Sequence, residues 1–339
     1  MQLGASYKTG RESTRLYTEG CQAAARYINA QPSEVVLGPS TTQLFRNLSF
    51  AIKWAPDDEI IVSKLDHEAN IASWVDIAER LNLKLIWWQP PAGRNPKLLP
   101  EDLKALMSEK TRLVACTHTS NLLGSIHDIS AIASVVHSFS RAQLCVDAVA
   151  YAPHRRIDVK ELDVDFYSFS WYKVYGPHIA MLYASQRAQE GMRTLGHFFN
   201  PASTLENKLG LAAANYELTA SIPKVVEYLE GVEVEVAAHE EVLAEVLLGY
   251  LRKREDVIVY GEPVADKKIR VPTISFAVNG WGAREVVETV EKDSDFGFRW
   301  GHFYSKRLCD DVLKTGDEGV IRVSMVSDAI PVTRLPFMC

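Results

Sequence analysis

The chain has 339 residues and a formal net charge of −6, which suits two domains and argues against a general nucleic-acid-binding protein with a basic patch. None of its apolar runs reaches the roughly 20 residues that a membrane span needs, and its amino terminus, MQLGASYKTGREST, lacks the apolar core of a signal sequence. Because its five cysteines are scattered and form no metal-binding or paired pattern, we expect a cytoplasmic protein without a metal site.

Helices and strands alternate through the first half of the chain. A helix is predicted over Ser13–Ala30, and short apolar runs typical of strands follow, separated by stretches with helical spacing. The predicted strands are Glu34–Gly38, Asp58–Lys64, Leu83–Gln89, Thr111–Thr119, Ala142–Ala148 and Val164–Ser170, and the predicted helices between them are Leu44–Trp54, Asn70–Asn82 and Asp128–Ser140. This alternation predicts an α/β fold with a mostly parallel sheet between helices.

The pattern changes after Tyr216. Ser221–Asp256 has mostly helical spacing, although its EGVEVEV stretch is capable of breaking the helix, and three strand-like pieces follow. We therefore predict a large domain over residues 1–230 and a small α+β domain over residues 231–339.

Polar residues follow the predicted strands where each strand ends. They are GPSTT after the first strand, LDHEAN after the second, THTSN after the fourth, Asp147 at the end of the fifth and Lys173 after the sixth. Because ligands in such sheets bind beyond the carboxyl ends of the strands, we expect these groups to converge on one edge.

The residue types at this edge suit one kind of cofactor. Hydroxyl and N–H groups at a helix start suit a phosphate, and an acid at a strand end can pair with a cationic nitrogen. The His67 imidazole can lie over a flat ring, and Lys173 can form a Schiff base if its free amine is available. Each residue alone has a simpler explanation, such as helix capping or a surface position, but their order favours a pyridoxal-phosphate site.

Five segments resemble one family, the class V aminotransferase group of fold-type I pyridoxal-phosphate enzymes, and within it the cysteine desulfurase-like proteins. The segments are GPSTTQLFRNLS, DHEANIASW, SNLLGSIHDI, VDAVAYAPHRRIDVKELDVDFYSFSWYKVYGP, and the pair RWGHFYSKRL and VIRVSMV. The resemblance implies a fold-type I architecture with a seven-stranded type of sheet, the cofactor pyridoxal 5′-phosphate and a homodimer.

The resemblance also implies roles for individual residues. His67 would stack on the cofactor ring, Asp147 would pair with its pyridine nitrogen, and Lys173 would carry the Schiff base. Asn121 would bond the phenolic oxygen, and Arg322 would bind the substrate carboxylate. The phosphate would be held by Thr41, Thr42, Ser170 and Tyr172, and the substrate-facing loop would contribute His302 and Tyr304.

The chain also departs from the family pattern. Tyr304 stands where desulfurases carry a sulfur-accepting cysteine, with Cys309 five residues further on. Ala150 replaces the usual Gln or His near the ring, and Ala213 replaces a Thr that often reaches the partner subunit's phosphate. By comparison with the family pattern, we expect that several tens of residues that usually open the family are missing at the start and that the end SMVSDAIPVTRLPFMC is atypical.

These features predict a pyridoxal-phosphate enzyme that acts on a small amino acid as a lyase or in β/γ-substitution, rather than as a transaminase. Two alternatives remain at this point. One is a cysteine desulfurase that uses Cys309. The other is a catalytically silent protein that keeps the fold and serves as a scaffold.

Overall fold

The computed structural model describes residues 2–210 and 214–325, and the chain divides into two compact units. The first, the large unit, comprises Met1–Pro90, Leu98–His118 and His127–Gly231. The second, the small unit, comprises Pro91–Lys97, Thr119–Ile126 and Val232–Cys339. The small unit thus also takes in two short segments that precede residue 231.

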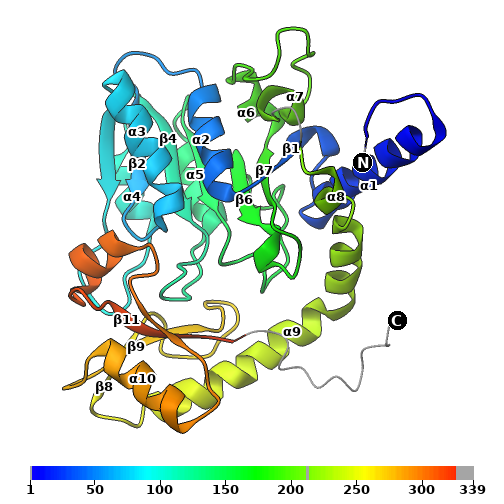
Figure 1. Cartoon of the computed structure of the whole chain (residues 1–339). Helices are drawn as coiled ribbons and strands as arrows, with labels where there is room; N and C mark the ends of the chain where they lie inside the picture. Colours follow the sequence, from blue (N-terminus) through cyan, green and yellow to red (C-terminus); the bar gives the residue numbers. More distant parts are fainter. Residues whose placement is uncertain (1, 211–213, 326–339) are drawn as a thin grey trace. The chain divides into compact units, whose positions relative to one another are not determined.

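A seven-stranded sheet forms the centre of the large unit (Figure 1), with the strand order β1-β7-β6-β5-β4-β2-β3. Its strands are β1 (Val35–Gly38), β2 (Glu59–Ser63), β3 (Lys84–Trp88), β4 (Thr111–Thr117), β5 (Gln143–Asp147), β6 (Phe166–Ser170) and β7 (Ala180–Ala184). Strands β3, β2, β4, β5 and β6 are parallel, whereas β7 pairs antiparallel with both β6 and β1. The predicted α/β architecture with a mostly parallel sheet is confirmed.

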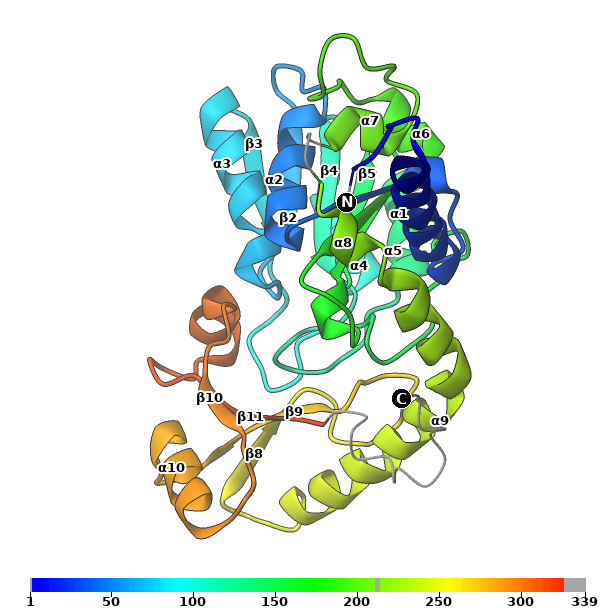
Figure 2. The same ribbon diagram turned by 45° about the vertical axis from the view of Figure 1, so that its right-hand side comes forward.

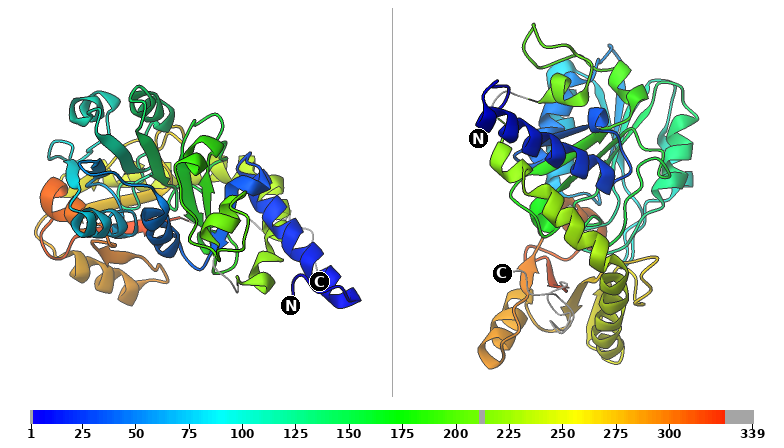
Figure 3. Two further views of the ribbon diagram at one scale, coloured as in Figure 1. Left: turned by 90° about the horizontal axis from the view of Figure 1, so that it is seen from above. Right: turned by 90° about the vertical axis from the view of Figure 1, so that its right-hand side faces the viewer.

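Helices cover both faces of this sheet (Figures 2 and 3). The α-helices of the large unit, with α9 continuing into the small one, are α1 (Lys8–Tyr27), α2 (Thr41–Ala51), α3 (Ala72–Leu81), α4 (Pro100–Leu106), α5 (Ile129–His137), α6 (Gln186–Glu190), α7 (Leu205–Leu209), α8 (Tyr216–Thr219) and α9 (Ile222–Leu251). Apolar residues of α2, α3 and α7 share one core cluster with sheet residues such as Ile60 and Leu113. Because strand side chains alternate between faces, fully buried neighbours such as Val114 face the opposite helix layer.

Three short 3₁₀ helices complete the large unit: η1 (Pro32–Glu34), η2 (Glu68–Asn70) and η3 (Trp171–Lys173). Strand β7 was absent from the sequence-based prediction. Its register, which pairs Ser170 with Ala180 and Gly38 with Ala180, brings the end of β6 and the end of β1 to the same edge.

The small unit contains a four-stranded antiparallel sheet in the order β10-β11-β9-β8. Its elements are β8 (Val257–Tyr260), β9 (Thr273–Val278), α10 (Ala283–Asp293), β10 (Arg299–Gly301), the π-helix η4 (Leu308–Leu313) and β11 (Val320–Ser324). Helix α9 continues without a break through the EGVEVEV stretch. In the described part of the chain, no helix combines the length and apolar character needed to cross a membrane.

Candidate active site

Asp147 lies at the carboxyl end of β5, in the middle of the sheet. Its carboxylate is buried, and Oδ1 accepts a hydrogen bond from the Val149 N–H at 2.9 Å. Burial raises the pKa of Asp147 to about 6, although this N–H and the charge of Lys173 act in the opposite direction. A cation that pairs with this carboxylate would therefore relieve an unfavourable buried charge.

Lys173 closes η3, directly after β6. Strand β6 pairs parallel with β5, so Lys173 and Asp147 follow neighbouring strands at the same end of the sheet. The two side chains are close enough for the charge of Lys173 to lower the pKa of Asp147. The lysine is exposed, while Trp171, two residues before it, and Val174, directly after it, are fully buried. These apolar anchors fix the backbone and leave the amine at the edge of the sheet. The Gly176 position must remain small, because an added Cβ would lie 2.9 Å from the Trp171 carbonyl oxygen.

A cluster of hydroxyl groups lies at the start of α2. Ser40 caps the helix and accepts a hydrogen bond from the Gln43 N–H at 3.1 Å. The buried Thr41 hydroxyl lies 2.7 Å from the Ser170 hydroxyl, which joins the helix start to the end of β6. The first N–H groups of a helix have no acceptor within it, so this helix start suits an anion such as a phosphate.

His67 lies in the loop after β2, and its Nδ1 accepts a hydrogen bond from the Ala69 N–H at 3.0 Å. This contact fixes the orientation of the ring. The neighbouring Asp66 is fully buried and accepts hydrogen bonds from the Thr117 N–H at 3.1 Å and from Asn70 at 2.6 Å. Burial raises the pKa of Asp66 well above its ordinary value. Asp66 thus links the His67 loop to the end of β4.

An aromatic cluster behind Asp147 was not predicted from the sequence. The buried His118 ring lies 2.7 Å from the Tyr167 hydroxyl and stacks on Tyr151, with ring centroids 3.6 Å apart. Burial, and then the charge of His127, lower the pKa of His118 to about 3, so the ring is neutral. The backbone N–H of His118 donates a hydrogen bond to the backbone carbonyl of Asp147 at 2.8 Å, which joins the ends of β4 and β5. The only sequence signal that could have pointed to this cluster is a histidine, His118, directly after the last residue of strand β4.

The two remaining phosphate candidates lie less deeply. Thr42 is exposed on the first turn of α2, and Tyr172 is 40% exposed. The Tyr172 ring stacks against His178, with centroids 5.0 Å apart. Their roles therefore remain predictions.

Four of the expected substrate-side and ring-side residues belong to the small unit. Asn121 donates from Nδ2 to the Phe303 carbonyl at 3.0 Å, and its Oδ1 accepts from the Ser305 hydroxyl at 2.9 Å. Arg322 donates from Nη1 to the Asn121 carbonyl at 3.0 Å and lies 3.9 Å above the Phe303 ring. These bonds join Asn121, Arg322 and the loop at Phe303 into one cluster. Ser305 and Phe303 were not singled out from the sequence.

The Arg322 guanidinium can donate a further hydrogen bond to a ligand. Its Nε is buried and has no hydrogen-bond partner within the described residues. Burial, and then the neighbouring Arg299, lower the pKa of Arg322 to about 10. A carboxylate would supply both the missing acceptor and the missing negative charge.

The loop after β10 has an unusual backbone. Phe303 and Tyr304 adopt φ values of 49° and 61°, and the Tyr304 N–H donates to Nδ1 of His302 at 3.2 Å. Positive φ at two successive non-glycine residues is uncommon and strained, and such strain clusters at functional sites. The Tyr304 side chain is 68% exposed. Cys309, in contrast, is fully buried in η4, and burial raises the pKa of its thiol.

The donor set of the large unit fits pyridoxal 5′-phosphate. Thr41, Ser170 and the start of α2 suit the phosphate, Asp147 suits a protonated ring nitrogen, and Lys173 would offer an amine for covalent attachment. Ala150 lies in the turn after Asp147 and offers no polar side chain to the ring. Ala213 and the atypical end at residues 326–339 lie outside the described residues.

Comparisons with known proteins agree with this fit. The sequence model of a family described as aminotransferase class-V matches residues 4–329. The chain is 53% identical to the aminotransferase-like protein FGM3 of Gibberella zeae, over 96% of this chain and 82% of that protein. It is 40% identical to the cysteine desulfurase-like protein ustD of Aspergillus flavus, over 93% and 74% of the two chains. Its fold is similar to that of the apo cysteine desulfurase of Thermococcus onnurineus, with a TM-score of 0.86, 22% identity and coverage of 96% and 82%.

Proposed function

We propose a lyase or a β/γ-substitution reaction for this chain, which belongs to the aminotransferase class-V family and is a pyridoxal-phosphate-dependent enzyme acting on an amino acid. The observation that carries the proposal is the convergence of Asp147, Lys173 and the Thr41–Ser170 pair at one edge of the sheet. When bound, the cofactor supplies an electron sink for the bond that breaks at the substrate α-carbon.

Individual residues of the chain would then orient the cofactor and transfer protons to and from the substrate. Asp147 would keep the ring nitrogen protonated, because an opposite charge nearby raises the pKa of a cation by roughly one to three units. Lys173 would hold the cofactor and afterwards carry protons at the α- and β-carbons of the substrate. His67 would limit the motion of the ring.

Arg322 and the loop at His302 and Tyr304 are proposed to bind the substrate. The unpartnered Nε of Arg322 supports this role for its side chain. Arg322→Lys, which keeps the charge but loses the planar fork, should raise KM for the amino acid at least tenfold while cofactor absorbance stays unchanged. An unchanged KM would assign Arg322 to the structure of the loop instead.

The desulfurase alternative receives less support. A sulfur acceptor must be an accessible thiolate, whereas Cys309 is buried and its pKa is raised. We therefore keep Tyr304 as a pocket wall or proton donor in the proposal. Transamination remains an outcome that the experiment below distinguishes.

The test is an amino-acid panel with the purified protein. Visible absorbance after addition of pyridoxal phosphate, fixed by borohydride on the peptide that contains Lys173, is expected for wild type and for the control Lys104→Ala, and should be lost in Lys173→Ala. Release of ammonia with a 2-oxo acid, or replacement of a β- or γ-substituent, supports the proposal. Attachment to another lysine would overturn the site, and a colourless protein would support the scaffold.

Assembly and location extend the proposal. We propose that the protein forms a homodimer, as the family does, and acts in the cytoplasm. Analytical ultracentrifugation that returns only a monomer at micromolar concentration would contradict the dimer.

A further inference from the structure

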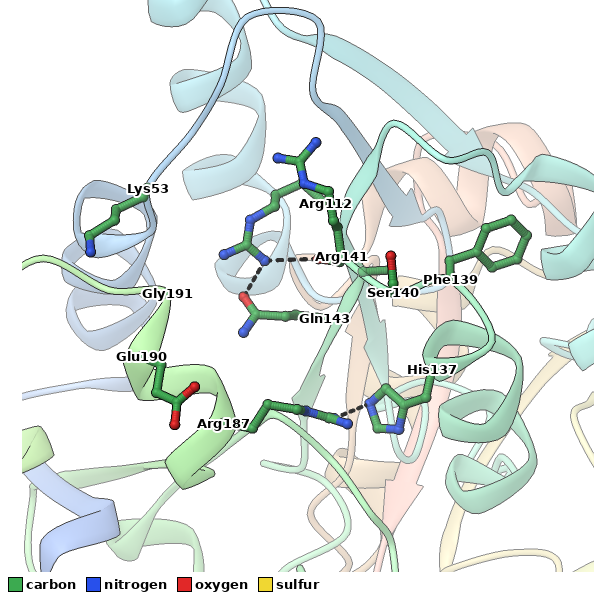
Figure 4. A pocket seen from close by; sticks show the side chains of 11 residues that line it. Lys53, Arg112, His137, Phe139, Ser140, Arg141, Gln143, Arg187, Glu190 and Gly191 are labelled. Atoms are coloured by element: carbon green, nitrogen blue, oxygen red, sulfur yellow. Dashed lines mark hydrogen bonds between the residues drawn. The ribbon is translucent and has the colours of Figure 1, made fainter.

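A second polar pocket lies at the opposite end of the parallel strands from Asp147 (Figure 4). Its volume is about 470 Å³, and its lining includes Arg112 at the start of β4 and Gln143 at the start of β5. Strand β5 runs from Gln143 to Asp147, so roughly 13 Å of extended chain separates this pocket from the active-site edge. We call it the basal pocket.

The basal pocket is rich in positive charge. Four cationic side chains line it, whereas Glu190 is the single carboxylate among its lining residues. Two of the cations already have partners outside the lining. Arg141 lies 3.0 Å from an Asp58 oxygen, and Arg187 lies 2.8 Å from an Asp165 oxygen. The remaining two, Arg112 and Lys53, determine what the pocket can bind.

Arg112 is a buried cation without a counter-charge in contact. Only 8% of the residue is exposed, and its Nη1 donates to the Arg141 carbonyl at 3.1 Å and to Gln143 Oε1 at 2.5 Å. Within the part of the chain that the structure describes, no carboxylate reaches ion-pair distance of this guanidinium, and the two acids whose charge acts on it from further away, Asp58 and Asp165, already pair with Arg141 and Arg187. Such a group costs free energy unless an anion pairs with it.

The free edge of Arg112 faces the pocket. Figure 4 shows one nitrogen of the guanidinium bonded to Gln143 and the other directed to the side of the pocket on which Lys53 and Gly191 lie. Gly191 preserves this space, because a Cβ added there would lie 2.8 Å from Arg112 Nη2. An oxyanion could therefore reach the two N–H groups of one edge of the fork.

Lys53 adds a second positive charge at the rim. Its ammonium group forms no hydrogen bond or ion pair with any other described residue, and the side chain is exposed. Burial, and then the charge of Lys53, lower the pKa of Lys208. The charge of Glu190, the carboxylate in the lining, acts on Lys208 in the opposite direction.

We propose that the basal pocket binds a small molecule with a carboxylate or phosphate group, held by Arg112 and Lys53, separately from the active site. The pocket volume lies within the range of roughly 300–1,000 Å³ that is common for small-molecule sites. The proposal does not depend on which reaction the active site performs.

The test is calorimetric titration of the protein loaded with pyridoxal phosphate, so that the groups at the start of α2 are occupied. Inorganic phosphate and succinate are the two probes, at low ionic strength. We expect saturable binding of at least one probe, with one site per chain and a Kd below about 1 mM. Phosphate alone would indicate a phosphorylated ligand, and succinate alone would indicate a dicarboxylate.

Variants assign the binding to this pocket. Arg112→Gln should weaken binding about tenfold or more, because a charged partner is lost. Lys53→Gln should weaken it about two- to fivefold, as expected for an exposed charge. The exposed lysine variant Lys104→Gln is the matched control and should bind like wild type. If Arg112→Gln fails to fold, the comparison of Lys53→Gln with Lys104→Gln decides. Absence of saturable binding, or equal binding by all variants, overturns the proposal.

Discussion

Asp147, the proposed partner of the cofactor ring nitrogen, lowers the stability of the cofactor-free protein at neutral pH. Its pKa of about 6 in the folded chain exceeds the ordinary value of 3.8, so the folded state holds the Asp147 proton more tightly than the unfolded state does. Stability from this group is therefore greatest below about pH 4, falls as pH rises toward 6, and stays reduced above that.

The substitution Asp147→Asn should separate these two effects. The neutral amide should raise the free energy of unfolding of the cofactor-free protein at pH 8 by on the order of 1–3 kcal/mol, with little change at pH 4. The same variant should bind pyridoxal phosphate more weakly, because an amide cannot pair with a protonated ring nitrogen. Urea unfolding at the two pH values and a cofactor titration measure both effects. A variant that is less stable at pH 8 would contradict the interpretation.

Tyr304 and Cys309 decide whether the enzyme can pass sulfur through a protein thiol. A phenol cannot accept a sulfur atom as a thiolate can, and Cys309 is buried. With cysteine and a reductant, we expect no persulfide-dependent sulfide release, so any sulfide should be the same in wild type and Cys309→Ser. Sulfide assays with both proteins and with Tyr304→Phe provide the measurement.

Two other outcomes of the sulfide assay are informative. Strong release by wild type that disappears in Cys309→Ser would establish the desulfurase alternative. Release that survives both substitutions would indicate elimination at the β-carbon through the cofactor, without a protein thiol.

At the scale of elements, helix starts and strand ends together place the active-site groups. The Ser40 cap sets where α2 begins, and the Thr41–Ser170 contact joins that point to β6. Antiparallel β7 makes this possible, since its register aligns Gly38, Ala180 and Ser170. At the opposite end of the sheet, the starts of the neighbouring strands β4 and β5 contribute Arg112 and Gln143 to the basal pocket. The two edges of one sheet thus carry different chemistry.

Two helical glycines allow a matched test of element packing. Gly231 lies within α9, and a Cβ added there would meet nothing within 4 Å. Gly231→Ala should therefore stabilise the protein by about 0.5–1 kcal/mol, because alanine loses less backbone freedom on folding.

Gly20 of α1 is the opposite case. A Cβ there would lie 2.3 Å from the carbonyl oxygen of Thr219, the last residue of α8, so Gly20→Ala should destabilise the protein by about 1–3 kcal/mol. Urea unfolding of both variants tests the pair. A Gly20→Ala variant that is more stable than wild type would show that α1 and α8 pack less closely than described.

At the scale of the whole molecule, one buried ion cluster ties distant segments of the large unit together. Asp165 is fully buried, accepts a hydrogen bond from the Leu144 N–H at 2.9 Å, and contacts His137 at 2.9 Å and Arg187 at 2.8 Å. Burial alone would raise the pKa of Asp165, but these three partners lower it overall. For His137 burial lowers the pKa, but its bonds to Asp165 and Asp163 raise it overall.

The pH dependence of the cluster follows from these directions. The Asp165 contribution is present above its ordinary pKa of 3.8 and is lost as pH falls through the lower folded value. The His137 contribution is full below about pH 6.5 and is lost as pH rises through the higher folded value. Asp165→Asn should therefore cost most between about pH 4 and 6.5, on the order of 2–3 kcal/mol. Unfolding free energies at pH 3, 5.5 and 8.5 provide the check, and a cost that does not vary with pH would refute it.

The amino-acid sequence by itself determined the parallel strands of the sheet and which polar residues follow their carboxyl ends. Apolar strand runs alternating with helical spacing are local properties, so they predicted the parallel strands before any contact was known. Because parallel strands share one carboxyl edge, Asp147, Lys173 and the GPSTT segment were expected together there. The resemblance to a family, which the comparisons confirm, supplied the cofactor.

Only the tertiary structure decided which polar groups lack partners and which residues are accessible. Strand β7 and its antiparallel register depend on pairing with residues far away in the sequence, as does the Thr41–Ser170 bond. The burial of Cys309 and the burial of Arg112 without a carboxylate in contact also depend on what packs around them. The burial of a side chain and its hydrogen-bond partners depend on residues that are distant in the sequence and close only in the fold. For this reason the sequence alone did not predict the basal pocket.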